Sequence, residues 1–444
     1  MDNDPAQNHI TGDSAVKIAS SIERMIRDGD LASGGHLPTV RSLADHLEVS
    51  PATVAAAYRS LRTRGLVISR GRRGTRVSPV LAAAVRRPST VVPAGVVNLA
   101  DGNPDPALLP DMYSALQQID PSARLYGEAA HHPKLVALMQ RELSEDGVPA
   151  GPMCIVSGAM EGIDRVLSEH LRPGDRVAVE DPGFTGILDM VASRGLSLLP
   201  VAVDDQAMQP ESLREAIKSG AKALIITPRV QSPTGSALTA ERARALRREL
   251  RAAPDLLVIH DDHARLITSA PLHLLVSTAT ARWAYIHSFS KALNPDLRLA
   301  VVTGDDTTMS RISQRMRITE RWVSHILQRI ALQLLSDRDV RQQLESATET
   351  YDARRQALLA ALNRRNLTAF GVSGFNIWLP VREETATVQA LAAAGWAVSP
   401  GERYRLNAPA GIRITASRLI PQNAERFAVA CADVLEPTAS ATHV

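Results

Sequence analysis

A regular alternation of short apolar runs and helical patterns, which begins near Asp101, is the strongest constraint on the fold. Strands that are separated by helices form a mainly parallel sheet with helices packed on its faces. Seven runs are expected to be strands of this sheet, at residues 154–156, 177–179, 198–203, 223–226, 256–259, 284–286 and 300–302. After about residue 330, long helical patterns lead to two more strands, 376–379 and 412–414. The sequence therefore predicts an α/β domain with a smaller C-terminal α+β subdomain.

The residues that follow the strand at 284–286 carry a lysine among small polar side chains. Burial disfavours the charged form of an amine, so Lys291 is a candidate Schiff-base nucleophile with a lowered pKa. Ser288, Ser290 and Arg298 lie on the same stretch and could hold a phosphate, with Arg298 as its bidentate partner. A reactive lysine beside a phosphate site is what the cofactor pyridoxal 5′-phosphate (PLP) needs. The plain alternative is a surface lysine in a polar loop.

Further groups suited to this cofactor follow other expected strands, at the edge of the sheet where ligands bind. Asp261 or Asp262 could pair with the protonated pyridine nitrogen, and Asp261 is preferred. Phe184 could stack on the ring, although a plain core position is the alternative. Ala159 and Met160 open an expected helix, so their free N–H groups could face the phosphate. Together these pieces predict a PLP-binding site.

Residues 14–78 predict a separate small domain, a helix-turn-helix followed by a wing of two short strands. Ser14, Thr39 and Ser50 are placed as the N-caps of three helices, and the third helix runs to about Arg64. The segment holds eleven lysine and arginine residues against five acidic ones, whereas the whole chain carries a net charge of only +3. A basic module on a nearly neutral body is typical of a protein that binds double-stranded DNA.

The third helix is expected to be the recognition helix, which enters the major groove of the DNA. Residues at its start would reach base edges, while its tyrosine and the arginines of the domain would bind phosphates. A solvated basic face is the alternative interpretation. The candidate DNA contacts are Arg41, Ser50, Ala52, Thr53, Tyr58, Arg59, Arg62, Arg72, Arg73 and Gly74.

The remaining sequence features concern the boundaries of the two domains and the location of the protein in the cell. Residues 1–13 are expected to be disordered and residues 79–96 to form a linker, which leaves 97–444 for the α/β domain. The two cysteines, Cys154 and Cys431, do not provide a disulfide framework and suggest a reducing cytosol. Neither a signal-peptide pattern nor an apolar run of membrane-spanning length is visible. We therefore expect a cytoplasmic protein without a membrane partner and without a metal site.

Two parts of the chain resemble known protein families. The part after about Asp101 resembles fold-type I aminotransferases in its motifs at 99–106, 179–182 and 261–263. The part before about Pro79 is similar to the GntR-type winged helix, and the fusion resembles the MocR family of transcriptional regulators, in particular its PtsJ-like branch. The resemblance implies a PLP-binding domain of fold type I and a head-to-tail, domain-swapped homodimer on operator DNA. For this branch it also implies control of vitamin B6 metabolism.

The resemblance also suggests roles for single residues. Tyr126 resembles the tyrosine that reaches the phosphate of the other subunit, and Arg413 resembles the arginine that holds a substrate carboxylate, which implies an amino-acid-like effector. His263 and Ser232 stand where the family usually has a tyrosine and an asparagine near the ring oxygen. Because an imidazole titrates near neutrality, His263 could make the site sensitive to pH. Each of these roles has a plain structural alternative. Tyr126 could be a core tyrosine, Arg413 could form an inter-domain ion pair, and His263 could be a core histidine.

Two functions are compatible with this pattern. The preferred one is a DNA-binding transcriptional regulator that uses PLP as its effector, without catalysis as its main role. Such a regulator works only if the ligand binds two conformations with different affinity. The alternative is an active PLP-dependent aminotransferase with an accessory DNA-binding module.

The DNA-binding domain departs from the family pattern at Pro51, which stands where GntR-type domains often have an arginine. The operator sequence of relatives is therefore not carried over to this chain.

Overall fold

The computed structural model describes residues 9–32, 34–63, 66–69, 74–77, 92, 95–277 and 280–435. The chain forms two compact units. The first is built on the N-terminal segment, and the second contains most of the chain after Ser89. The expected linker at 79–96 lies almost entirely outside the described residues.

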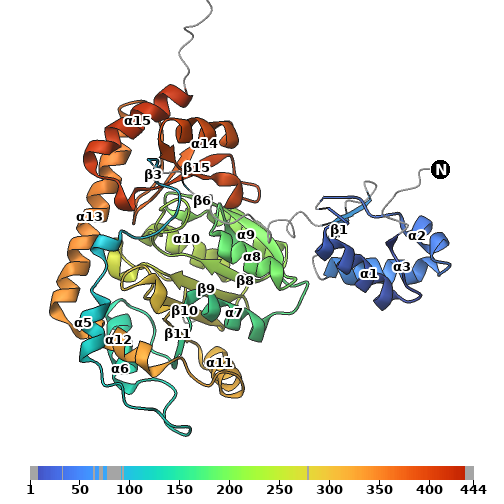
Figure 1. Ribbon diagram of the computed structural model, residues 1–444. Coiled ribbons are helices and arrows are strands. Elements are labelled where there is room, and N and C mark those ends of the chain that lie inside the picture. The colour runs from blue at the N-terminus through green and yellow to red at the C-terminus, as the bar shows by residue number, and fades with distance from the viewer. Residues whose placement is uncertain are drawn as a thin grey trace, which may run out of the picture. The chain divides into compact units, whose positions relative to one another are not determined.

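The N-terminal unit contains the expected three helices and two strands (Figure 1). Each helix begins beside a side-chain cap: the hydroxyls of Ser14, Thr39 and Ser50 accept hydrogen bonds from backbone N–H groups three residues later. These caps satisfy donors that have no partner inside the helix. The elements are α1 Ala15–Asp28, α2 Val40–His46, α3 Pro51–Thr63, β1 Val67–Ser69 and β2 Thr75–Val77, with β1 and β2 antiparallel.

Apolar side chains from all three helices meet in the core of this unit. Ile18, Ile22, Leu43 and Leu61 are fully buried there. Ile10 packs into the same core with 1% of its surface exposed, although it lies within the residues expected to be disordered. Its apolar side chain is fixed by burial, so the ordered domain begins before the first helix cap.

The second unit is built around an eight-stranded sheet in the order β4-β11-β10-β9-β8-β5-β6-β7. Strands β8, β9 and β10 run parallel, whereas β11 is antiparallel to both of its neighbours, β10 and β4. The strands are β4 Met153–Val156, β5 Arg176–Asp181, β6 Ser197–Asp204, β7 Ala207–Met208, β8 Ala221–Ile226, β9 Leu257–Asp262, β10 Trp283–Ser288 and β11 Ala300–Gly304.

The large sheet was predicted to have seven strands, and it has eight. The additional strand, β7, has two residues and pairs only with the end of β6 in a tight hairpin. A strand of two residues is too short to give an apolar run, so sequence periodicity could not show it. All seven expected strands are present at the predicted places.

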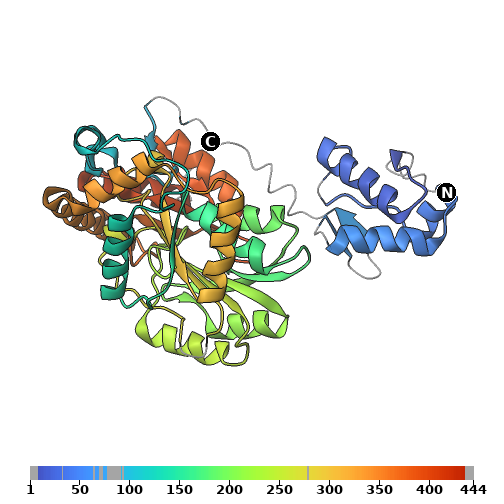
Figure 2. The ribbon, with the colours of Figure 1, turned by 90° about the horizontal axis from the view of Figure 1, so that it is seen from below.

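Helices cover both sides of this sheet (Figure 2). Helix α7 packs against β4, β9, β10 and β11, while α9 packs against β8. The helices of this layer and of its surroundings are α5 Met112–Gln118, α6 Pro133–Glu145, α7 Ala159–His170, α8 Thr185–Ser193, α9 Pro210–Lys218, α10 Ala240–Leu250, α11 Asp306–Ile318 and α12 His325–Ser336. Within the described ranges, no helix is both long enough and apolar enough to cross a membrane.

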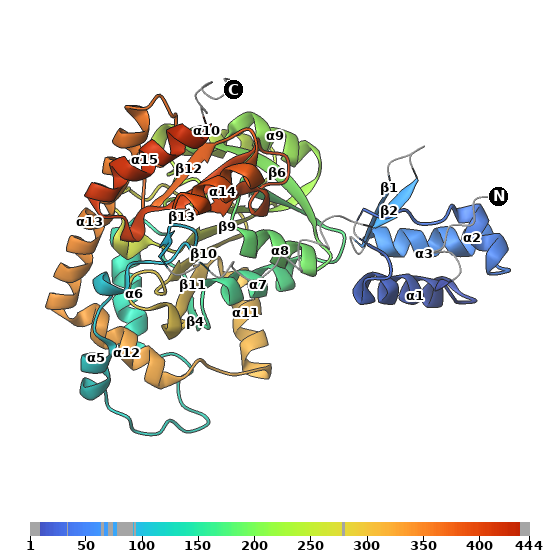
Figure 3. The same ribbon diagram turned by 45° about the horizontal axis from the view of Figure 1, so that its top comes forward.

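The expected smaller subdomain follows, and it contains an antiparallel sheet in the order β12-β15-β14 (Figure 3). A separate parallel pair joins β13 to β3, so the first residues of the second unit lie beside its last part. Helices α13 and α15 pack together over the subdomain core. The elements are β3 Val97–Asn98, α13 Arg338–Asn363, β12 Asn376–Pro380, α14 Glu384–Ala393, β13 Trp396–Ala397, β14 Ser399–Pro400, β15 Gly411–Thr415 and α15 Pro421–Leu435.

Candidate functional site

A pocket of about 300 Å³ lies at the carboxyl ends of the parallel strands. It brings together ten of the eleven residues that were predicted to contact the cofactor, and Arg413 as well. Sequence reasoning assigned no cofactor contact to five further lining residues, although two of them lie in the motif at 99–106. The predicted residues in the lining are Ala159, Met160, Phe184, Ser232, Asp261, His263, Ser288, Ser290, Lys291 and Arg298. The others are Asp101, Gly102, Thr227, Phe375 and Asn376.

Lys291 lies in the loop after β10, and its amine points into this pocket. Burial, with a smaller contribution from the nearby Arg413, lowers the pKa of the Lys291 amine to about 8. Its Nζ donates a hydrogen bond to the carbonyl oxygen of Gly102 at 2.5 Å. A lowered pKa makes more free amine available at neutral pH, as a Schiff-base nucleophile requires.

The pKa of Lys291 predicts how fast PLP attaches at different pH values. Because the amine reacts only when it is uncharged, the initial rate is expected to rise about tenfold per pH unit below pH 7. The rate should level off above about pH 8, where the amine is mostly free. Stopped-flow absorbance over pH 6 to 10 would measure this profile. A rate that keeps rising up to pH 10 would mean that the amine is not shielded from water.

Asp261 and Asp262 point in opposite directions, because consecutive residues of a strand face opposite sides of the sheet. Asp261 lines the pocket, and its Oδ1 is buried without a hydrogen-bond partner among the described residues. Burial, and then the charge of Asp262, raise the pKa of Asp261 to about 7. An unpartnered buried carboxylate fits the cationic N–H of a pyridinium ring. The geometry thus favours Asp261, the preferred residue of the pair.

Asp262 belongs instead to an ion-pair network behind the pocket. Its Oδ2 accepts hydrogen bonds from Nη2 of Arg229 at 2.7 Å and from the hydroxyl of Tyr285 at 2.5 Å. Burial opposes the charge of Asp262, but Arg229 keeps the pKa of this carboxyl below its ordinary value. Arg229 also reaches Asp146 at 3.3 Å, which connects the network to the end of α6.

The two aspartates should therefore differ in their effect on stability. Asp262→Asn removes the nearer and fully buried charge partner of Arg229 and leaves only Asp146, at 3.3 Å. Breaking such a buried pair typically costs about 3–5 kcal/mol. Asp261→Asn removes a carboxylate whose charge is disfavoured in the cofactor-free protein, so it should leave the free energy of unfolding nearly unchanged or raise it. Urea unfolding of both variants without PLP measures the difference. Equal losses of stability would show that the two carboxylates are not distinguished in this way.

Groups suited to a phosphate gather at the N-terminal end of α7. Arg298 has a left-handed backbone, with φ 45°, and its guanidinium lies against Gly158. A Cβ atom at Gly158 would lie 2.9 Å from Nη2 of Arg298, so the close approach requires glycine. Ser290 has a buried Oγ without a hydrogen-bond partner among the described residues. Free donors beside a helix N-terminus and an arginine form a suitable phosphate site.

His263 and Ser232 both line the pocket, so each could reach a ring substituent of the cofactor. Burial, and then the nearby Lys291, lower the pKa of His263 to about 4. The imidazole is therefore neutral at physiological pH. The expectation that His263 titrates near neutrality is wrong, because that expectation ignored the cost of burying its charged form.

Arg413 is buried, with 6% of its surface exposed, and it forms no ion pair within the described part of the chain. Its guanidinium lies 4.9 Å from the centre of the Tyr404 ring, and it donates a hydrogen bond to the carbonyl of Ala100. Burial lowers the pKa of this group, and its Nε has no partner among the described atoms. The alternative of an inter-domain ion pair is not observed, and the free donor fits a carboxylate.

Tyr126 lies outside this pocket, and 80% of its surface is exposed. Its ring packs against Trp322, with 5.5 Å between the ring centres, and the guanidinium of Arg321 lies 5.3 Å from the ring. The alternative of a core tyrosine is therefore wrong.

The N-terminal unit exposes most of the predicted DNA contacts. Six of them, Arg41, Ser50, Ala52, Arg59, Arg62 and Gly74, are exposed, and Thr53 is half-buried at the start of α3. The prediction that Tyr58 contacts DNA is wrong. Its side chain is only 6% exposed, and its hydroxyl donates a hydrogen bond to the carbonyl of Pro38 at 2.7 Å. Its side chain supports the core and is not available to a phosphate. Arg72 and Arg73 lie outside the described residues.

Comparison with known protein families identifies both units. The aminotransferase class I and II family matches residues 94–430, and the bacterial regulatory proteins of the gntR family match residues 14–77. The vitamin B6 salvage pathway transcriptional repressor PtsJ of Salmonella typhimurium is 41% identical over 418 residues, which cover 92% of this chain and 96% of the repressor. The pyridoxine biosynthesis transcriptional regulator PdxR of Corynebacterium glutamicum is 26% identical, over 77% of each chain.

Solved structures show the same fold for the second unit. The kynurenine aminotransferase of Pyrococcus horikoshii has a TM-score of 0.71 at 21% identity, and the match covers 81% of this chain and 97% of that enzyme. The α-aminoadipate aminotransferase LysN of Thermus thermophilus has a TM-score of 0.69 at 21% identity, covering 80% of this chain and 96% of that one. The second unit thus has the fold of these enzymes.

Proposed function

Because the chain belongs to the MocR-type family, in which a gntR-family domain precedes an aminotransferase class I and II domain, we propose that it is a transcriptional regulator whose DNA binding responds to PLP. One observation carries the proposal: a pocket with a shielded lysine and an unpartnered aspartate occurs in the same chain as an exposed recognition helix. The similarity to PtsJ supports a role in vitamin B6 metabolism. We place the protein in the cytoplasm.

Different residues of the pocket would bind different parts of the cofactor. When bound, PLP supplies an electrophilic carbonyl carbon and a pyridine ring that withdraws electrons. Lys291 would offer its free amine, while Arg298 and Ser290 would bind the phosphate. Asp261 would hold a proton at the pyridine nitrogen, since a carboxylate beside a cationic N–H is stabilised. Phe184 would lie against the ring.

Regulation requires that PLP favours one conformation of the protein. Arg413 belongs to β15 of the smaller subdomain, whereas Lys291 belongs to the loop after β10 of the large sheet. A ligand that contacts both would favour the conformation in which they lie close together. Because Arg413 has a free donor, an amino-acid-like effector with a carboxylate is proposed as a second ligand. The coupling free energy between ligand binding and DNA binding is then limited by the difference in the free energy of ligand binding between the two conformations.

We also propose that the protein is a homodimer. Six large apolar side chains are exposed on the neighbouring segments 113–126 and 318–326, namely Tyr113, Leu116, Leu125, Tyr126, Ile318 and Ile326. Contiguous exposed apolar surface marks an interaction site. Leu125→Asp together with Ile318→Asp should weaken the dimer, because each variant places an unpaired charge in the interface. Analytical ultracentrifugation measures the dissociation constant, with Val16→Asp, at an exposed site outside both segments, as the matched control.

An aminotransferase activity is the second candidate function, and the joint presence of Lys291 and Arg413 in one pocket favours it. Sustained conversion of an amino acid to its keto acid, at an ordinary enzyme turnover of about 1 per second or more, would support it. The primary test of the regulator is DNA binding with and without PLP. Binding that is identical in both conditions would remove PLP as the effector.

A further inference from the structure

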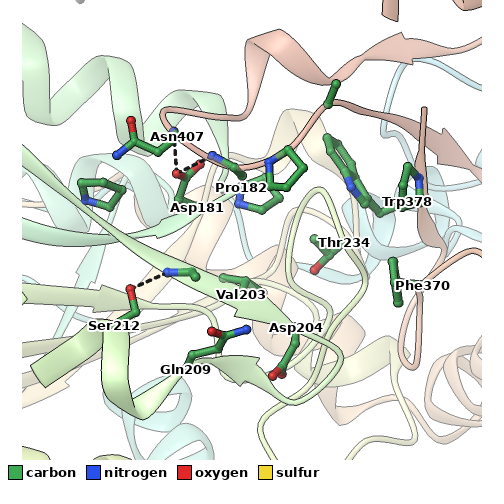
Figure 4. A pocket seen from close by; sticks show the side chains of 16 residues that line it. Asp181, Pro182, Val203, Asp204, Gln209, Ser212, Thr234, Phe370, Trp378 and Asn407 are labelled. Carbon is green, nitrogen blue, oxygen red and sulfur yellow. Dashed lines mark hydrogen bonds between the residues drawn. The ribbon is translucent and has the colours of Figure 1, made fainter. Parts of the chain in front are cut away.

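A second pocket, with a volume of about 500 Å³, shares no lining residue with the cofactor pocket. Figure 4 shows the side chains that line it. One wall comes from the edge of the large sheet, the opposite wall from the smaller subdomain, and the loop 407–410 closes one side. A volume of this size is typical of sites for small organic ligands. The function proposed above makes no use of this pocket.

Two aromatic side chains form the wall on the side of the subdomain. Phe370 and Trp378 are paired in a β-bridge, and each donates its backbone N–H to the carbonyl of the other at 2.8 Å. Residues that are paired in this way place their side chains on the same face. The indole of Trp378 packs on Gly401 and Gly411, where an added Cβ would lie 2.5 and 2.3 Å from its ring carbons. This contact fixes the indole in place, so the aromatic wall is preorganised.

The opposite wall is the outer part of β6, and its polar groups are already paired. Pro200 has no N–H, and the N–H of Ala202 donates to the hydroxyl of Ser212 at 2.9 Å. The carboxylate of Asp204 pairs with Arg242 at 2.8 Å. A mostly apolar wall therefore faces the aromatic one across the pocket (Figure 4). Such a slot fits a flat ring, which gains contact on both of its faces.

The charges of the lining favour some ligands and oppose others. The lining contains two carboxylates, of Asp181 and Asp204, and no lysine, arginine or histidine. An anion would lose its hydration there without gaining a cationic partner, which is costly. The side-chain amides of Gln209 and Asn407 make no hydrogen bond within the described part of the chain, so they can bind polar atoms of a ligand. The cofactor pocket has the opposite character, with Lys291 and two arginines.

We propose that this pocket binds a small planar aromatic molecule that carries no negative charge, and that its occupancy is coupled to that of the cofactor pocket. The first part depends only on the shape and charge of the lining. The coupling rests on the cofactor assignment made above. Failure of the first part would therefore leave the proposed regulator intact.

The coupling follows from three segments that form walls of both pockets. One segment contributes Pro182 to this pocket and Phe184 to the cofactor pocket, and a second contributes Thr234 and Ser232 in the same way. The third is β12, which contributes Trp378 to this pocket and Asn376 to the cofactor pocket. A ligand that fixes these segments changes the positions of cofactor contacts, and linkage requires the reverse effect to be equal.

One side chain joins two of the walls directly. The carboxylate of Asp181 accepts hydrogen bonds from the backbone N–H groups of Leu406, Asn407 and Ala408, at 2.8, 2.7 and 2.9 Å. Figure 4 shows Asp181 beside Asn407. These bonds hold the loop of the subdomain to the segment that carries Phe184. Closing this loop over a ligand would therefore act on the residue that faces the cofactor ring.

The binding test uses three probes of nearly identical shape: benzamidine, benzamide and benzoate, with charges of +1, 0 and −1. The full-length protein is first loaded with PLP and reduced with borohydride, so that the cofactor pocket is filled. Ligand-observed NMR titration should show that benzamide and benzamidine bind at least about tenfold more tightly than benzoate. Benzoate binding that is as tight as that of the other probes, or no binding of any probe, would overturn the proposal.

Two variants locate the probes in this pocket. Ala408→Leu and Ala202→Leu fill it from the loop and from β6, and each should weaken benzamide binding by about tenfold or more. Ala393→Leu, at an exposed position of α14, is the matched control and should bind benzamide like the unchanged protein. Thermal melting checks that each variant is folded. Unchanged benzamide binding in both folded pocket variants would place the probe elsewhere and contradict the proposal.

The coupling is tested on the unreduced protein by titrating PLP with and without saturating benzamide. The dissociation constant of PLP should change by about fivefold or more, which is the lower range of coupling between linked sites. The change should disappear in Ala408→Leu and persist in Ala393→Leu. An unchanged PLP affinity, in a protein that binds benzamide, would overturn the coupling.

Discussion

Replacing Lys291 with alanine is expected to abolish the visible absorption band of lysine-bound PLP. The band requires a covalent bond between the cofactor and an amine, and Lys291 is the lysine in the lining of the cofactor pocket. Lys222→Ala, at an exposed position, is the matched control and should keep the full band. Absorbance spectra of the dialysed proteins measure this difference. A band of normal intensity in Lys291→Ala would place the covalent bond at another lysine.

The same variant should also lose the response of DNA binding to PLP while it keeps its affinity for DNA. The N-terminal unit has its own buried core and its own caps, so removing an amine from the second unit does not alter the recognition helix. If Lys291→Ala failed to bind DNA in the absence of PLP, the two units would not act as separate functional parts.

Replacing Arg41 and Arg62 with alanine is expected to weaken DNA binding strongly. Both side chains are exposed on the helix-turn-helix, where they can bind phosphates. Each phosphate contact that is lost should lower the slope of log affinity against log salt concentration by about one. The double variant should therefore lose about two units of slope, together with at least tenfold in affinity at low salt. Fluorescence anisotropy at several salt concentrations measures both quantities.

Lys17 provides the control for this experiment. It is an exposed cation of the same unit, but it lies on α1 and pairs with Asp13 at 2.8 Å. Lys17→Ala should change neither the affinity nor the salt slope beyond the small effect of one exposed charge. If it weakened binding as much as Arg41→Ala and Arg62→Ala together, the effect would reflect net charge rather than docking of the recognition helix.

Much of the cofactor pocket could be predicted from the sequence, because its residues follow strands in short motifs. In a parallel sheet the carboxyl ends of strands meet at one edge, so Lys291, Asp261 and Ser232 had to lie near each other. The choice between Asp261 and Asp262 was harder. It depends on which face of β9 turns toward the pocket, and a run that is buried on both faces does not show this.

The burial of Tyr58, which was wrongly predicted to contact DNA, could have been predicted from its spacing in the sequence. Tyr58 lies four residues after Val54 and three before Leu61, so it belongs to the apolar stripe of α3. The side chains of Arg59 and Arg62, on the same helix, are exposed. A tyrosine in a basic domain looks suited to DNA, but the helical spacing assigns it to the core, where its hydroxyl bonds to Pro38.

The second pocket could not have been predicted from the sequence. Its lining combines Pro182, Ala202, Trp378 and Ala408, which are far apart in the chain, and of these four only Pro182 belongs to a motif. Only the packing of the smaller subdomain against the edge of the large sheet brings them together. Similarly, the pKa of His263 depends on burial that no local pattern shows, and the sequence alone suggested a titration near neutrality.

The most direct test of the central claim is the affinity of the purified full-length protein for its operator, selected from genomic DNA, with and without PLP at one fixed salt concentration. If PLP is the effector, the dissociation constant or the footprint will change with PLP, and the change will be absent in Lys291→Ala. The same constant and footprint in all conditions would contradict a PLP-responsive regulator, whatever else the pocket binds.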